Sequence, residues 1–198
     1  MEAVPRLPMI SFELKTSKEN PDFNKVVRRL IAELGEDPAG FDKEIKELES
    51  LRANTCIRAS ESVEGVAVAK KYYCQLLFLK NRFKLGSEGP FQFSWNDIYF
   101  KSSYSSSDIT HELSSVLYNI GSIHSSLGAA EQRQESEGMK MAVAHFQCAA
   151  WALHTLPDKY PQVRGKYFIS DFVAPQVKIL LKKSQYSAKF LKKILRIF

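Results

Sequence analysis

Two neighbouring stretches decide the fold: residues 108–128, DITHELSSVLYNIGSIHSSLG, and residues 137–156, EGMKMAVAHFQCAAWALHTL. In both, apolar residues recur every three or four positions, the period that places them on one face of an α-helix. The first stripe is Ile109, Leu113, Val116, Leu117, Ile120, Ile123 and Leu127, and the second is Met139, Val143, Phe146, Ala150, Leu153 and Leu156. Both stretches are also rich in small residues, which let helices approach closely. We therefore predict two long helices packed together, in a helical scaffold whose function lies on an outer surface.

Three further helices are expected before these two. Apolar residues at helical spacing place them over 23–34, 38–51 and 66–83. Gly35 suits the stop position of the first, and Asp37 followed by Pro38 suits the start of the second. The pair of prolines in residues 157–161 is expected to end the second long helix.

Two segments have the alternating pattern of half-buried strands. In residues 9–15, Ile10, Phe12 and Leu14 point to one side, while Ser11, Glu13 and Lys15 point to the other. Residues 91–96 alternate in the same way, so the two segments are predicted to pair in a small sheet. The serine-rich residues 101–107 are predicted to form a surface loop.

Composition indicates a one-domain globular protein of 198 residues, and its net charge of +6 is unevenly distributed. Residues 172–198 hold seven cations and no acid, so the rest sums to 6 − 7 = −1. A nearly neutral body does not indicate nucleic-acid binding. The chain has no apolar run of about 18 residues and no signal-like N-terminus, so a cytosolic protein is expected.

No set of residues with catalytic spacing is present. The chain lacks GxSxG, HExxH, a Gly-rich phosphate loop and a cysteine followed by a phosphate-cradling loop. Cys56, Cys74 and Cys148 are far apart and odd in number, which favours buried free thiols over disulfides or a zinc site. His145 and Cys148 form an i,i+3 pair, but such a pair more often packs in a core. We expect no catalytic residue, no metal and no cofactor.

The last residues, 182–198, are predicted to form a basic amphipathic helix. Such a helix adsorbs to an anionic membrane or packs against a protein face, and the sequence leaves both open. On a membrane, the contacting residues would be Lys189, Phe190, Lys192, Lys193, Ile194, Arg196 and Phe198.

Five segments of the chain form a recognisable set: MEAVPRLPMI, KKYYCQLLFLKNRF, FSWNDIY, VLYNIGSIHSSLGA and EGMKMAVAHFQCAA. Together they resemble the Bro-one domain of endosomal-sorting adaptors, in the branch of Alix and the His-domain protein tyrosine phosphatase. The resemblance is good over residues 1–156, weak over 157–181 and absent afterwards. It implies a partial Bro-one domain over 1–181, followed by an unrelated tail helix over 182–198.

The resemblance implies a mainly α fold, a curved solenoid of TPR-like helix hairpins with a small N-terminal sheet. It also implies a non-enzymatic adaptor of the cytoplasm and endosome that acts in multivesicular body formation. Its partner would be the C-terminal helix of a charged multivesicular body protein, a subunit of ESCRT-III. Ser136, Lys140 and Ala144 match family contact positions, although Ala144 departs from the polar or larger residue of relatives.

The family domain is about twice as long as this chain, and the family's phosphatase-like domain is absent. The apolar groove residues of the family lie on later helices. Weakened partner binding is therefore expected of what looks like a fragment.

Overall fold

The computed structural model describes residues 11–97, 102–132 and 134–161. The helices are α1 (Phe23–Glu33), α2 (Asp42–Arg52), α3 (Val63–Arg82), α4 (Ile109–Ala130) and α5 (Ser136–Lys159), and the strands are β1 (Phe93–Asp97) and β2 (Ser102–Ser106). A 3-10 turn, Pro38–Phe41, precedes α2, and a π-helical turn, Ala53–Ile57, follows it. The predicted fold, mainly helical with one small sheet, is confirmed.

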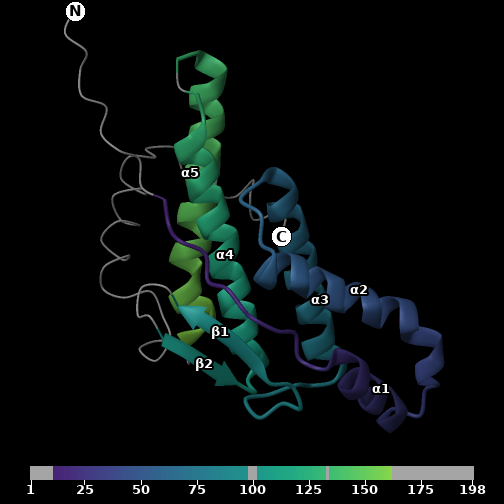
Figure 1. The fold of residues 1–198 in the computed structure, drawn as a ribbon. Helices are drawn as coiled ribbons and strands as arrows, with labels where there is room; N and C mark the ends of the chain where they lie inside the picture. Colours follow the sequence, from purple (N-terminus) through teal and green to yellow (C-terminus); the bar gives the residue numbers. More distant parts are fainter. Residues whose placement is uncertain (1–10, 98–101, 133, 162–198) are drawn as a thin grey trace, which may run out of the picture.

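The two long helices lie side by side as an antiparallel hairpin, as predicted (Figure 1). Asp108 caps α4 by accepting a hydrogen bond from the backbone N–H of Thr110 at 2.8 Å. Small residues set the close approach: a Cβ added at Gly121 would lie 3.0 Å from Leu153. One side of α5 thus packs against α4, and the opposite side of α5 faces outward.

The predicted helices 23–34, 38–51 and 66–83 are present with shifted ends. Gly35 adopts a φ of +78° after α1, the left-handed conformation that glycine favours. The third helix begins at Val63, because Ser62 caps it through the N–H of Gly65 at 3.0 Å. Helix α5 continues through Pro157 and ends at Lys159, within the proline-containing residues 157–161 that were predicted to end it.

The sheet differs from the prediction. Strand β1 pairs with β2, the serine-rich segment that was predicted to be a loop, in the register Phe93↔Ser106 and Trp95↔Tyr104. Within the described residues, the backbone of the N-terminal segment pairs with β1 through one isolated bridge, between Thr16 and Asn96. A hairpin needs only a short connection, which makes β2 the nearer partner for β1.

The N-terminal segment instead runs along α4 (Figure 1) and pairs with its side chains. Ser125 Oγ accepts from the N–H of Phe12 at 2.9 Å, and Ser122 donates to the carbonyl of Phe12. Asn119 accepts from the N–H of Lys15 at 2.9 Å and donates to its carbonyl at 2.8 Å. Side chains at three-residue steps of α4 thus take the place of a neighbouring strand.

Lys15 was predicted to face solvent, and this was wrong. Its side chain is only 6% exposed, and its ammonium lies 5.3 Å from the ring centre of Tyr118. Phe12, on the predicted inner side, is buried. The alternation therefore identified the buried phenylalanine but not a lysine that lies over aromatic rings.

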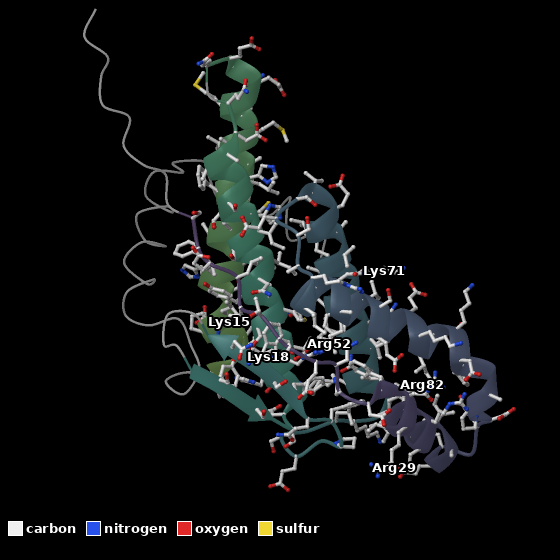
Figure 2. The ribbon with its side chains drawn as sticks, in the orientation of Figure 1. Lys15, Lys18, Arg29, Arg52, Lys71 and Arg82 are labelled. Atoms are coloured by element: carbon white, nitrogen blue, oxygen red, sulfur yellow. The ribbon has the colours of Figure 1, made fainter. Side chains whose placement is uncertain are left out.

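A buried ion pair ties the elements together. Figure 2 labels its arginine, Arg52. The guanidinium Nε of Arg52 donates to Glu112 at 2.9 Å, and both side chains are fully buried. Tyr72 Oη and Trp95 Nε1 donate to the same carboxylate at 2.7 Å and 2.6 Å. Arg52 also donates to the carbonyl of Glu19 at 2.6 Å. One carboxylate on α4 thus joins α2, α3 and β1, and its arginine partner holds the N-terminal segment.

Candidate functional site

The three predicted contact residues share one side of α5. Ser136, Lys140 and Ala144 recur every four positions, the spacing that aligns side chains on a helix surface. Ser136 and Lys140 are exposed and Ala144 is half-buried, whereas Ala142 and His145 point into the protein. The structure thus brings the three together on an outward face, which we call the α5 face.

Lys140 is held only weakly on this face. Its ammonium lies 3.2 Å from a carboxylate oxygen of Glu137, and both side chains are about three-quarters exposed. An exposed pair of this kind is worth about 0–1 kcal/mol. An acidic group on a partner can therefore replace Glu137 at little cost.

Two exposed methionines flank the α5 face. Met139 is 49% exposed and Met141 is 44% exposed. The sequence placed Met139 on the buried stripe, and this was wrong. The buried side of α5 differs from the predicted stripe because alanines pack against α4, among them Ala142, Ala149 and Ala152. Methionine is flexible and polarisable, which suits an adaptable binding surface.

A histidine pair between α4 and α5 lies behind the α5 face. His124 Nδ1 is 3.0 Å from His145 Nδ1, so one ring donates a hydrogen bond to the other. Burial, with Lys70 and His145 nearby, lowers the pKa of His124 to about 3, and burial also lowers the pKa of His145. Both rings are neutral near pH 7. Sequence spacing could not reveal this pair, because its members are 21 residues apart on different helices.

A second surface was missed by the sequence reasoning. A groove of about 650 Å³ lies between α1, α2 and α3, over an apolar floor that includes Val27, Ile31, Ile45 and Leu79. Phe78 lines it and is 68% exposed. The run of residues 76–79, LLFL, was a signal, because four consecutive apolar residues cover more than one face of a helix.

Comparison with known proteins gives the family. The family model described as a BRO1-like domain matches residues 9–193. This chain belongs to the BRO1-like domain family. Tyrosine-protein phosphatase non-receptor type 23 from Mus musculus is 37% identical over 187 residues, which are 93% of this chain and 11% of that protein. Rhophilin-1 from Mus musculus is 36% identical over 156 residues, 78% of this chain and 24% of that protein. This chain thus spans only 11% and 24% of the length of these two relatives.

Solved structures agree on the fold. The "ALIX BRO1 CHMP4C complex" superposes with a TM-score of 0.77 at 23% identity, covering 90% of this chain and 55% of that one. "Structure basis for endosomal targeting by the Bro1 domain" superposes with a TM-score of 0.61 at 22% identity, covering 82% and 44%. Both matches extend over most of this BRO1-like domain and about half of the compared chain.

Two of the three thiols of the BRO1-like domain are poorly suited to nucleophilic catalysis. Burial raises the pKa of Cys56 and of Cys148, which keeps both protonated near pH 7. Cys74 is exposed, so the prediction that all three thiols are buried was wrong for it. Within residues 11–97, 102–132 and 134–161, no three His, Cys, Asp or Glu side chains gather as metal ligands would.

The membrane prediction falls outside the described residues. This applies to Lys189, Phe190, Lys192, Lys193, Ile194, Arg196 and Phe198, and to the boundary expected at residue 181. In the part of the chain that the structure describes, no helix has the length and apolarity needed to span a membrane.

Proposed function

We propose that this chain is a non-enzymatic adaptor module of endosomal sorting, which binds the C-terminal helix of an ESCRT-III charged multivesicular body protein through the α5 face. The observation that carries the proposal is the outward row of Ser136 and Lys140, which are exposed, and Ala144, which is half-buried, flanked by Met139 and Met141. Family membership and the fold shared with a BRO1 domain in a CHMP4C complex support it.

The α5 face suits an amphipathic helix with an acidic side. Ala144 is small enough for a partner helix to lie close, and the methionines offer adaptable apolar contact. Lys140 would pair with a partner carboxylate at the solvent-exposed edge, where an ion pair contributes modestly to affinity. Such a contact favours orientation and specificity over strength.

The chain spans 55% of the compared Alix chain. We expect these 198 residues on their own to bind the peptide more weakly than a full-length BRO1 domain, because a partner helix gains affinity from any contact with the unmatched part of that domain. We also propose a cytoplasmic, endosome-associated role, because the chain belongs to the BRO1-like family and shares its fold with a Bro1 domain solved as a basis for endosomal targeting.

The test is a titration of a fluorescent CHMP4C C-terminal peptide against this chain and against a full-length BRO1 domain. We expect detectable binding to this chain that is weaker than binding to the full domain. Lys140→Glu should weaken it about fivefold or more, because it turns an exposed attraction into repulsion. Lys46→Glu, at an exposed position of α2, is the matched control.

Two results would contradict the proposal. One is the absence of binding to this chain at millimolar peptide. The other is an equal effect of the Lys140 and Lys46 substitutions, which would show that net charge alone governs binding. Equal affinities of the two proteins would instead show that the missing half adds no contact.

A further inference from the structure

The groove between α1, α2 and α3 has the character of an occupied site. Its volume, about 650 Å³, falls within the range of binding pockets in proteins. Ile31 and Ile45 on its floor are nearly inaccessible, while Phe78 on its wall leaves 68% of its surface in water. An apolar depression with an exposed aromatic wall favours an apolar occupant.

The charges at the groove favour a cation on that occupant. Arg82 lines the groove but is neutralised by Glu36, which accepts from it at 2.6 Å and 2.8 Å. Glu44 also lines the groove, and in the described part of the chain it has no ion-pair partner. The other pairs nearby, Lys71 with Glu47 and Arg28 with Asp42, are mutually compensated. Of the two charged residues that line the groove, Arg82 is therefore paired within the described residues and Glu44 is not.

The chain itself contains a segment with the required chemistry. Residues 189–198, KFLKKILRIF, carry four cations, no acid and a stripe of apolar side chains at helical spacing. The stripe is Phe190, Leu191, Ile194, Leu195 and Phe198. We propose that this segment docks in the α1–α3 groove as an amphipathic helix, with its stripe against Phe78 and one of its cations beside Glu44.

The connection is long enough for this contact. At the end of α5, the hydroxyl of Tyr160 lies 2.5 Å from that of Tyr73 on α3, and the ammonium of Lys159 lies 5.2 Å from the Tyr73 ring centre. The 28 residues 162–189 would span about 42 Å even if wholly helical, against about 30 Å for the whole of α3. Because the segment is tethered, its effective concentration is on the order of millimolar.

Photo-crosslinking in the full chain tests the proposal. p-Benzoylphenylalanine replaces Phe190, the chain is irradiated at low micromolar concentration, and the products are mapped by mass spectrometry. We expect intramolecular cross-links to residues that line the groove. The same probe at Arg196, on the opposite side of the segment, should give few of them.

Two substitutions on α3 provide the matched comparison. Phe78→Asp should lower the yield of the groove cross-link about tenfold, because it removes the apolar side chain that the docked segment would cover. Val63→Asp should leave it unchanged, since Val63 is also exposed (61%) but lies at the start of α3, away from the groove. Circular dichroism confirms that each variant is folded.

Three outcomes would overturn the proposal. Cross-links that map to the α5 face would place the segment there. Cross-links that increase with protein concentration would identify a second copy as the occupant. A groove cross-link that is absent, or equally lowered by both substitutions, would show that the segment does not dock on Phe78. Only the first of these outcomes bears on peptide binding, because a segment docked on the α5 face would compete with the peptide. The other two leave the proposed function untouched.

Discussion

Replacing Glu112 with glutamine removes the counter-charge of a fully buried arginine. Glutamine keeps the volume of the side chain, but only one of its two head-group atoms can accept a hydrogen bond. Tyr72 and Trp95 donate to different oxygens of Glu112, so one of these two hydrogen bonds is lost as well. Arg52, which is 0% exposed, keeps its charge, and its Nη2 already has no hydrogen-bond partner in the described residues. Breaking a buried pair on one side costs about 3–5 kcal/mol. We expect Glu112→Gln to lower the free energy of unfolding by this amount.

Urea denaturation at pH 7, followed by circular dichroism at 222 nm, measures the loss. The matched control is Glu47→Gln, because Glu47 pairs with Lys71 on the surface, where both side chains are about half exposed. That solvent-screened pair should contribute little to stability, so Glu47→Gln should cost far less than Glu112→Gln. The double variant Arg52→Met with Glu112→Gln should lose less than the sum of the two single variants, by about 0.5–3 kcal/mol, because the stranded charge is gone.

The reasoning fails if Glu112→Gln costs no more than Glu47→Gln. It also fails if the losses of the two single variants simply add, because additivity would mean that Arg52 and Glu112 do not stabilise each other in the folded protein.

Three further predictions concern the helix hairpin and the thiols. The pKa of His124 is about 3 in the folded protein, below its unfolded value of about 6.5. The unfolded chain therefore takes up a proton first, so the stability that neutral His124 contributes is complete above pH 6.5 and is lost as the pH falls. Lowering the pH from 7 to 5 should therefore reduce the free energy of unfolding by about 2 kcal/mol through this residue alone. In urea titrations at both pH values, the decrease for His124→Phe should be smaller than the decrease for the parent chain by about 2 kcal/mol. Gly121→Val should destabilise the fold by about 1–3 kcal/mol in thermal denaturation, since its side chain would meet Leu153, whereas Gly86→Val, with open space around it, should not. Cys74 should react with Ellman's reagent in the native chain much faster than Cys56 and Cys148, and Cys74→Ser should abolish the fast phase; a fast phase that persists would contradict the exposures of the three thiols.

The sequence predicted the helices well because their apolar period persists over several turns. In residues 108–128 every predicted stripe position except Leu127 is buried, so local spacing was enough. It failed for Ser102–Ser106, because serines carry neither the alternation nor the β-branched side chains that indicate a strand. Strand β1 was recognised from its alternating pattern, but β2, with four serines in five residues, has no pattern that indicates a strand.

Long-range polar contacts were beyond reach of the sequence. Asn119, Ser122 and Ser125 hold the N-terminal segment from more than 100 residues away, and Arg52 meets Glu112 across 60. Nothing in local periodicity pairs such residues. The α5 face came from family resemblance, which supplied positions on one helix. The groove around Phe78 has no such precedent in the sequence, since it requires the relative placement of three helices.

The most direct test of the account is hydroxyl-radical footprinting of the chain with and without the CHMP4C peptide. Met139 and Met141 flank the α5 face and are about half exposed, so both should oxidise readily in the free chain. We predict that saturating peptide protects these two methionines and leaves the oxidation of Phe78 unchanged. Protection of Phe78 with Met139 and Met141 still fully reactive would contradict the claim that α5 is the partner-binding helix.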